Sequence, residues 1–145
     1  MTERTSRQTA LAARASAAGD ADGVALVLSQ PLSFWGGIDV TTGRIIDRTH
    51  PDVGKSVTGV ILVMPGARGS SSSSSVLAET IRNGTGPAGI VVGVPDPILT
   101  VGAIVAESLY GVRCPIVVCP IEGFSTGMRV RIRAGVTGPA SVERW

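Results

Sequence analysis

Three continuous apolar runs lie between residues 57 and 119. They are "VTGVILVMP" from residue 57, "GIVVGV" from residue 89 and "CPIVVC" from residue 114. Short runs without polar alternation are typical of strands that are buried on both faces. We therefore expect three core strands between residues 57 and 119.

Two helices are predicted between these strands. The first follows six serines at positions 70–75, with Val76, Leu77 and Ile81 on one side and Asn83-Gly84 as its stop. The second begins with an N-cap and a first-turn proline at 96–97 and runs to about residue 110, where a glycine ends it. Its apolar stripe consists of Ile98, Val101, Ile104, Val105 and Leu109.

The alternation of strand and helix with short connections predicts right-handed parallel crossovers, and hence an α/β fold. Glycine turn signals in residues 24–56 predict short irregular strands, so the first half of the domain is expected to be β-rich. The tail from Met128 alternates like a half-exposed strand. Residues 1–23, rich in Ala, Arg, Ser and Thr, are expected to be a flexible extension of a domain spanning 24–145.

Composition narrows the class of protein. Hydrophobic residues make up 43% and charged residues 17%, which excludes disorder for most of the chain. The net charge is only +2 and the arginines are scattered, so we expect no nucleic-acid partner. No apolar stretch reaches the length of a membrane span and the first residues lack a signal-peptide core, so we expect a cytoplasmic protein with no membrane partner.

The chain carries few metal-binding side chains. Cys114 and Cys119 are five positions apart on a predicted strand, so their side chains point to opposite faces and are expected to be core thiols. His50, the single histidine, lies in a loop and is expected to be structural. We therefore expect no metal site in this chain alone, and any metal must come with a partner.

Two glycine motifs resemble nucleotide-binding signatures without their context. "GTGPAG" at 84–89 follows a helix and precedes a strand, which is the reverse of the dinucleotide-binding order. "GKS" at 54–56 lacks the glycine that opens a phosphate-binding loop, and a strand follows it instead of a helix. Both are expected to be turns.

The stretch "VILVMPGARGSSSSSS" has the order strand, glycine loop, helix. Unpaired N–H groups at the helix start attract anions and would stabilise the alkoxide of Ser70 or Ser71. The alternative is that the serines only cap the helix and allow close packing. Arg68 could hold a substrate carboxylate or phosphate, or it could be a solvated loop residue.

An aromatic pair stands beside two glycines in "FWGGID", residues 34–39. Such a segment could form a hydrophobic plug or a lip that meets another surface. We favour an interface.

Three blocks in order, "PLSFWGGIDVTTGRIID", "HPDVGKSVTGVILVMPGARGSSSSS" and "PDPILTVGAIVAESLYG", resemble the small subunit, or swivelling domain, of the aconitase X group. The resemblance covers about residues 28–120. It implies a swivelling β/β/α domain and a role as the smaller half of a heteromeric hydro-lyase. The larger subunit would carry an iron or iron–sulfur centre.

The resemblance also implies roles for individual residues. In the aconitase superfamily a Gly-Ser-Ser segment of this domain supplies the serine that takes a proton from carbon, and Gly69-Ser70-Ser71 matches it. Ser70 is then the first candidate base, with Ser71 as its neighbour. Ser72 stands where aconitase proper has a substrate-binding arginine, so a tricarboxylate substrate is not expected. Arg68, Gly69 and Ser72 are the candidate substrate-binding residues.

Two dehydrations are implied for the aconitase X group. Bacterial members dehydrate cis-3-hydroxy-L-proline and archaeal members dehydrate mevalonate 5-phosphate, and the arginine-rich composition favours the first, which yields 1-pyrroline-2-carboxylate. In this reaction the iron polarises the leaving hydroxyl and the serine removes the α-proton. The competing hypothesis is a non-catalytic module that binds a small anion at the serine-rich helix start.

Overall fold

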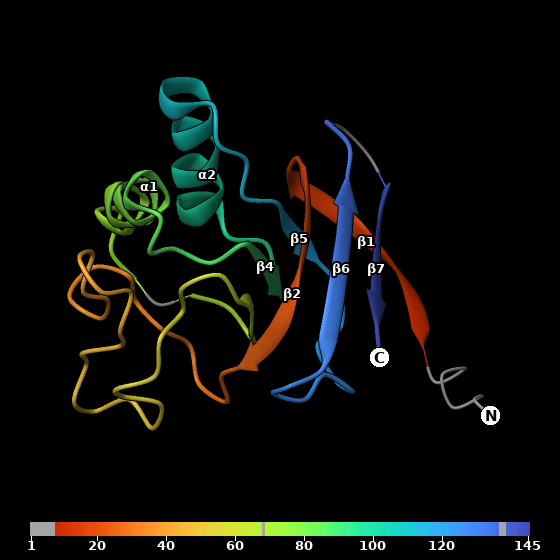
Figure 1. Cartoon of the computed structure of the whole chain (residues 1–145), viewed down its shortest axis with the longest axis horizontal. Helices are drawn as coiled ribbons and strands as arrows, with labels where there is room; N and C mark the ends of the chain where they lie inside the picture. Colours follow the sequence, from red (N-terminus) through yellow and green to blue (C-terminus); the bar gives the residue numbers. More distant parts are fainter. Residues whose placement is uncertain (1–7, 68, 137–138) are drawn as a thin grey trace.

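The structure is a computed structural model, and it describes residues 8–67, 69–136 and 139–145. Within these residues the elements, in chain order, are β1 Thr9–Ala17, β2 Gly19–Val27, β3 Ile61–Met64, α1 Ser73–Asn83, β4 Gly89–Val92, α2 Pro97–Tyr110, β5 Ile116–Val118, β6 Arg129–Ala134 and β7 Pro139–Arg144. The strands close into a barrel in the order β1-β5-β4-β3-β2-β6-β7. Both helices lie on one side of this barrel (Figure 1).

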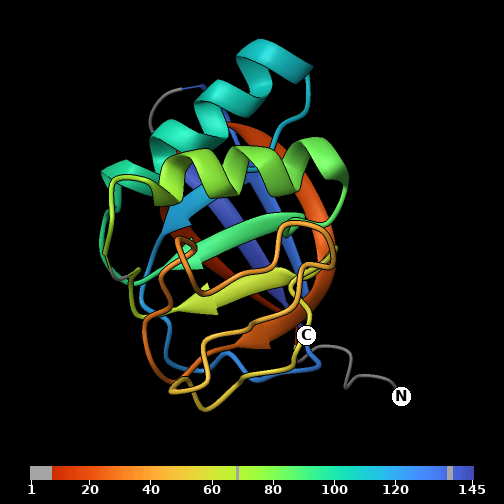
Figure 2. The same ribbon diagram turned by 90° about the vertical axis from the view of Figure 1, so that its left-hand side faces the viewer.

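The middle of the barrel is parallel, as predicted. Strands β2, β3, β4 and β5 run in the same direction, with Leu62 opposite Leu26 on one side and opposite Ile90 on the other. Helix α1 connects β3 to β4 and helix α2 connects β4 to β5, so the two helices cover the same outer face of the sheet (Figure 2). The remaining strands, β1, β6 and β7, pair antiparallel and close the barrel.

The parallel strands separate two hydrophobic cores. In β3, Leu62 and Met64 pack toward the helices, while Ile61 and Val63 point into the barrel. Because both faces are buried, these strands need apolar residues at every position, which explains the continuous runs in the sequence. The two cysteines that flank β5 divide in the same way, as predicted: Cys114 belongs to the outer core and Cys119 to the barrel interior.

Both helices end where the sequence predicts. Gly84 closes α1 in the left-handed conformation with φ 75°, and Gly111 closes α2 with φ 70°. At the start of α2 the Asp96 carboxylate accepts the N–H of Leu99 at 3.0 Å, and Pro97 occupies the first turn. These ends satisfy the backbone groups that a helix leaves unpaired.

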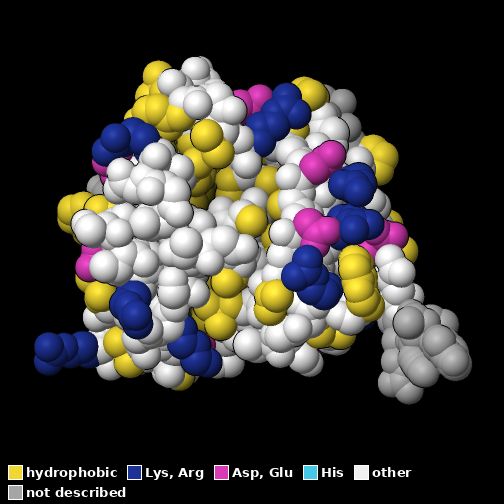
Figure 3. All heavy atoms as spheres, viewed as in Figure 1, with side chains coloured by type: hydrophobic (Ala, Val, Ile, Leu, Met, Phe, Trp, Pro, Cys, Tyr) yellow, Lys and Arg dark blue, Asp and Glu magenta, His cyan; other side chains and the backbone are white. Residues whose placement is uncertain are grey.

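The apolar stripe of α2 faces outward. Val101, Ile104 and Leu109 are 51%, 53% and 65% exposed, whereas the buried face carries Leu99, Gly102, Ala103 and Ala106. The small residues allow α2 to lie close to α1, since a Cβ added at Gly102 would be 2.6 Å from the carbonyl oxygen of Ser74. Figure 3 shows hydrophobic side chains over the helical part of the molecule and charges of both signs gathered over β6.

The structure corrects the predicted N-terminal extension. Of residues 1–23, the first seven lie outside the described residues, but residues 9–17 belong to β1 and residues 19–23 to β2. Strand β1 pairs with both β5 and β7, and β2 pairs with both β3 and β6. The sequence hides these strands because their inward positions are filled by alanine and glycine, which have low β-propensity and little hydrophobic contrast. The domain therefore begins well before residue 24.

Residues 28–60 cover one side of the outer core with turns. Within them the expected short strands reduce to isolated bridges: Leu32 with Ala67, Ile38 with Ile45, and Arg44 with Ser56. His50 is buried there and structural, as predicted: its Nε2 lies 3.1 Å from the Gln30 carbonyl oxygen and its Nδ1 accepts the Asp52 N–H at 3.0 Å. No helix in the described ranges is long and apolar enough to cross a bilayer.

Candidate functional site at the start of helix α1

The predicted serine site lies at the carboxyl end of the parallel strands. Strand β3 ends at Met64, and Gly69–Ser72, hereafter the serine loop, leads into α1. The turn after β4 lies against the residue that follows β3, because the Gly93 N–H donates to the Pro65 carbonyl at 3.2 Å. The segments that lead from β3 into α1 and from β4 into α2 both start at this edge of the sheet.

Ser70 lies shortly before the start of helix α1. Its side-chain oxygen accepts the N–H of Ser72 at 3.2 Å, and its carbonyl accepts the N–H of Ser73 at 2.9 Å. Helix α1 begins at Ser73, so the positive end of the helix lies next to this oxygen. A donated N–H and a helix start both favour the ionised form of a hydroxyl.

The two neighbouring serines have different surroundings. Ser71 is exposed, and its carbonyl accepts the Oγ–H of Ser74 at 2.9 Å. Ser72 is the N-cap residue, but its backbone is already helical, with φ −67° and ψ −14°, and its side chain makes no capping hydrogen bond. Side-chain capping at Ser72 therefore does not explain the serine-rich start of this helix.

Gly69 opens the serine loop in a conformation that favours glycine. Its φ is +126°, and a Cβ there would lie 3.2 Å from the Ser33 hydroxyl oxygen. A side chain would therefore be strained and crowded. Arg68, the predicted substrate-binding arginine, lies outside the described residues.

The segment 34–39 has one buried and one exposed aromatic residue. Phe34 is fully buried in the outer core, whereas Trp35 is 59% exposed. The N–H of Trp35 donates to the hydroxyl of Ser73 at 3.0 Å, so this segment is attached to the start of α1. Ser73 is the serine of the run that sequence reasoning missed. Its place as the first buried position of the helix, four residues before Leu77, was the available signal.

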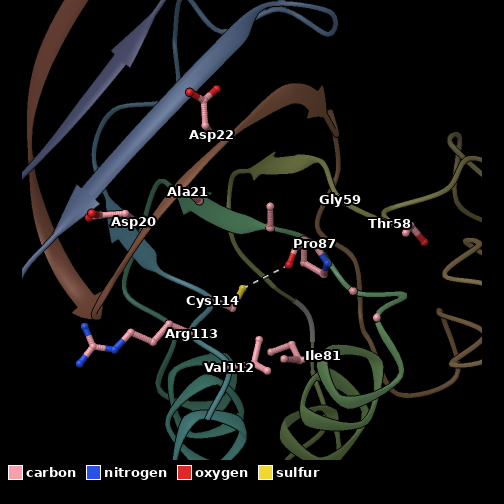
Figure 4. A pocket seen from close by; sticks show the side chains of 13 residues that line it. Asp20, Ala21, Asp22, Thr58, Gly59, Ile81, Pro87, Val112, Arg113 and Cys114 are labelled. Atoms are coloured by element: carbon pink, nitrogen blue, oxygen red, sulfur yellow. Dashed lines mark hydrogen bonds between the residues drawn. The ribbon is translucent and has the colours of Figure 1, made fainter. Parts of the chain in front are cut away.

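A cavity of about 410 Å³ lies at the opposite, amino end of the parallel strands. Gly59 and Ala88, which precede β3 and β4, line it, and Figure 4 shows Cys114 directed toward the Pro87 carbonyl, 3.5 Å away. Burial raises the pKa of Cys114 to about 12, so its thiol stays protonated. At the rim of the cavity the Asp22 carboxylate accepts a hydrogen bond from Arg131. This bond lowers the pKa of Asp22 and occupies its carboxylate. The cavity thus offers no free acid, base or thiolate among these groups.

Comparison with known proteins points to one family. A family model described as "Aconitase X swivel domain" matches residues 10–138. The crystal structure of Thermococcus kodakaraensis aconitase X in its holo-form superposes with a TM-score of 0.84 at 33% identity, covering 94% of this chain and 98% of that one.

Two named relatives are similar over shorter stretches. Cis-3-hydroxy-L-proline dehydratase of Pseudomonas aeruginosa is 48% identical over 103 residues, which are 71% of this chain but 18% of that protein. The phosphomevalonate dehydratase small subunit of Methanopyrus kandleri is 50% identical over 82 residues, which are 57% of this chain and 61% of that one. The chain therefore spans less than two thirds of the length of either relative.

Proposed function

Because the chain belongs to the aconitase X swivel-domain family, we propose that it is the small subunit of a heteromeric hydro-lyase. This chain covers 98% of the matched Thermococcus chain but only 18% of the longer Pseudomonas relative. The same domain thus occurs both as a short chain and as part of a longer one. Both patterns support a larger partner subunit, which carries the rest of the active site.

The observation that carries the proposed chemistry is the hydrogen bond from the Ser72 N–H to the Ser70 side-chain oxygen. In the proposed reaction the Ser70 alkoxide removes the proton from the α-carbon of a hydroxy acid. The electron pair forms the new carbon–carbon double bond as the β-hydroxyl leaves, and together with the proton this hydroxyl makes up one water. With cis-3-hydroxy-L-proline the product is an enamine, which tautomerises to the cyclic imine 1-pyrroline-2-carboxylate.

The residues described here do not fit an iron centre. Among them, no group of three His, Cys, Asp or Glu side chains could hold a metal ion, and both cysteines are buried in separate cores. We therefore place an iron or iron–sulfur centre in the larger subunit. The contribution of this chain is the serine base, the N–H that stabilises it, and a surface that helps to exclude water when the subunits meet.

The proposed substrate is cis-3-hydroxy-L-proline, supported by 48% identity to a dehydratase of that name over most of this chain. Mevalonate 5-phosphate is the second candidate, because a phosphomevalonate dehydratase small subunit is 50% identical over a shorter stretch. The candidate substrate contacts of this chain are Arg68, Gly69 and Ser72.

The test is to co-express the chain with a larger aconitase X subunit from the same source and to supply each substrate to the complex. We expect 1-pyrroline-2-carboxylate from the wild-type complex, and none from the chain alone or from a Ser70→Ala complex. Ser75→Ala, an exposed serine of the same run, is the matched control and should remain active. Turnover of mevalonate 5-phosphate instead would replace the substrate and keep the role of Ser70.

Two other outcomes would contradict the catalytic role. Full activity of Ser70→Ala would leave the chain with a role in assembly only. No turnover of either substrate, together with phosphate binding by the isolated chain that Ser70→Ala weakens, would favour the anion-binding module.

A further inference from the structure

Two serines attach the segment around Trp35 to the start of α1. The Ser73 hydroxyl oxygen accepts the N–H of Trp35 at 3.0 Å, and the Ser33 hydroxyl donates to the carbonyl of Trp35 at 3.0 Å. The two hydroxyl oxygens are 3.4 Å apart. We call these three residues, Ser33, Trp35 and Ser73, the serine latch.

The hydroxyl protons can satisfy every contact of the latch at once. Each serine hydroxyl has one proton to donate. The Ser33 proton goes to the Trp35 carbonyl, so the contact between the hydroxyls is made by the Ser73 proton. The result is a closed ring in which the Trp35 N–H and carbonyl are both bound, and such rings hold their members more firmly than separate hydrogen bonds do.

The latch also contacts the serine loop directly. Gly69 lies against Ser33, as the 3.2 Å approach of an added Cβ to the Ser33 oxygen shows, and the N–H of Ser73 donates to the Ser70 carbonyl at 2.9 Å. The loop that carries the candidate base thus lies between two latch residues, with Ser33 near Gly69 at its start and Ser73 directly after Ser72 at its end. Ser73 itself is 1% exposed, so its hydroxyl has no surface with which to meet a substrate.

We propose that Ser33 and Ser73 are positioning residues for Ser70, an inference that rests on the proposed function of Ser70 as the base. They fix the backbone of Trp35 against the start of α1 and so limit the motion of this segment and of the serine loop that precedes the helix. Proton transfer requires the base oxygen to be placed within hydrogen-bonding reach of the carbon acid, so a loosened loop lowers the rate without removing the base.

The first measurement reports on the latch without any assay of activity. The chain has two tryptophans, so Trp145→Phe leaves Trp35 as the only one. In this background Ser73→Ala should increase the fast, sub-nanosecond part of the Trp35 fluorescence anisotropy decay about twofold, because the segment gains local motion. Ser75→Ala should leave the decay unchanged. If Ser73→Ala does not fold, Ser33→Ala removes the other hydroxyl from a position outside the helix and should give the same increase.

The second measurement is kinetic and uses the complex with the larger subunit, at a temperature where all variants are folded. Ser73→Ala and Ser33→Ala should each lower kcat about tenfold with KM changed less than about twofold, the pattern expected when a base is misplaced. The double variant should lose no more than either single one, because both break the same ring.

The outcomes separate this inference from the proposed function. An unchanged anisotropy decay in both serine variants would overturn the latch. A Ser73→Ala complex as inactive as Ser70→Ala, with Trp35 unmoved, would also overturn it, since Ser73 would then act in proton transfer itself. Increased Trp35 motion in a complex that dehydrates neither substrate would contradict the proposed function alone and leave the latch standing.

Discussion

The two crossover helices begin differently although both follow buried parallel strands and cover the same face of the barrel. Helix α2 starts with the Asp96 carboxylate bound to a backbone N–H and with Pro97 in its first turn. Helix α1 starts after six serines, yet its N-cap residue, Ser72, makes no side-chain capping bond. The hydroxyls of Ser70 and Ser73 instead contact the backbone of the serine loop and of Trp35.

This difference agrees with the proposed roles, in which the start of α2 serves stability and the start of α1 serves catalysis. The start of α2 needs nothing beyond a helix end that satisfies its own backbone. The start of α1 carries hydroxyls beyond what a helix end uses, held by a segment about forty positions earlier in the chain. Variants at the two junctions should therefore affect different measurements.

The largest effect is expected at Ser70. Ser70→Ala should lower kcat of the dehydratase complex about a thousandfold, because it removes the oxygen that takes the proton. The unfolding midpoint in urea should change little. Asp96→Ala, the matched change at the start of α2, should leave kcat of the folded complex within about twofold. An equal loss of kcat in both variants would contradict the difference proposed between the two helix starts.

The next effect tests the close contact between helices α1 and α2. Gly102→Val places a Cβ where only 2.6 Å separates it from the Ser74 carbonyl oxygen, so the helices must move apart. We expect the free energy of unfolding, measured in urea, to fall by about 1–3 kcal/mol. Ala106→Gly removes one methyl group from the same buried face of α2. It serves as the comparison because it does not force the helices apart. Undiminished stability in Gly102→Val would show that the close approach is not required.

A smaller effect compares the two N-cap residues directly. Asp96→Ala should reduce the free energy of unfolding by about 1 kcal/mol, because the Leu99 N–H loses its acceptor. Ser72→Ala should reduce the free energy of unfolding by no more than a few tenths of that amount, because the Ser72 side chain makes no capping hydrogen bond. Urea unfolding of both variants measures the difference, and a larger cost for Ser72→Ala would restore the capping interpretation of the serines.

The smallest effect is expected on the outer face of α2. Leu109→Ser should change the free energy of unfolding by less than about 0.5 kcal/mol, because the side chain is 65% exposed in this chain. Thermal or urea unfolding of the isolated chain provides the measurement. A loss comparable to that of a core leucine would mean that this stripe is covered in the isolated chain.

Much of the fold follows from local pattern. Strands β3, β4 and β5 were predictable because burial on both faces demands continuous apolar runs, and Gly84, Gly111 and Asp96 mark helix ends by their own chemistry. Strand β1 and the first half of β2 were missed because their buried positions hold small residues whose partners lie far away in the sequence. Pairing of this kind leaves no local signal.

The candidate site was predictable in part. A glycine loop between a buried strand and a helix indicated Ser70 or Ser71, and the family resemblance put Ser70 first. In the structure the Ser72 N–H lies against the Ser70 side-chain oxygen. The burial of Ser73 was missed, because six identical residues look alike unless the helix phase is counted back from Leu77. Likewise, the apolar stripe of α2 was visible, but the face that packs is set by the small residues that let α1 approach.

The pairing of β1 with β7 also has a consequence for synthesis on the ribosome. Strand β1 can pair with β5 along one edge. Its other edge, where Thr9 lies opposite Arg144, finds its partner only when β7, the last strand, has emerged. Until then β1 and β2 present open edges, which are prone to pair with other chains. We expect the barrel to close late and in one cooperative step, so that a nascent chain halted after β5 would depend on chaperones rather than fold by itself.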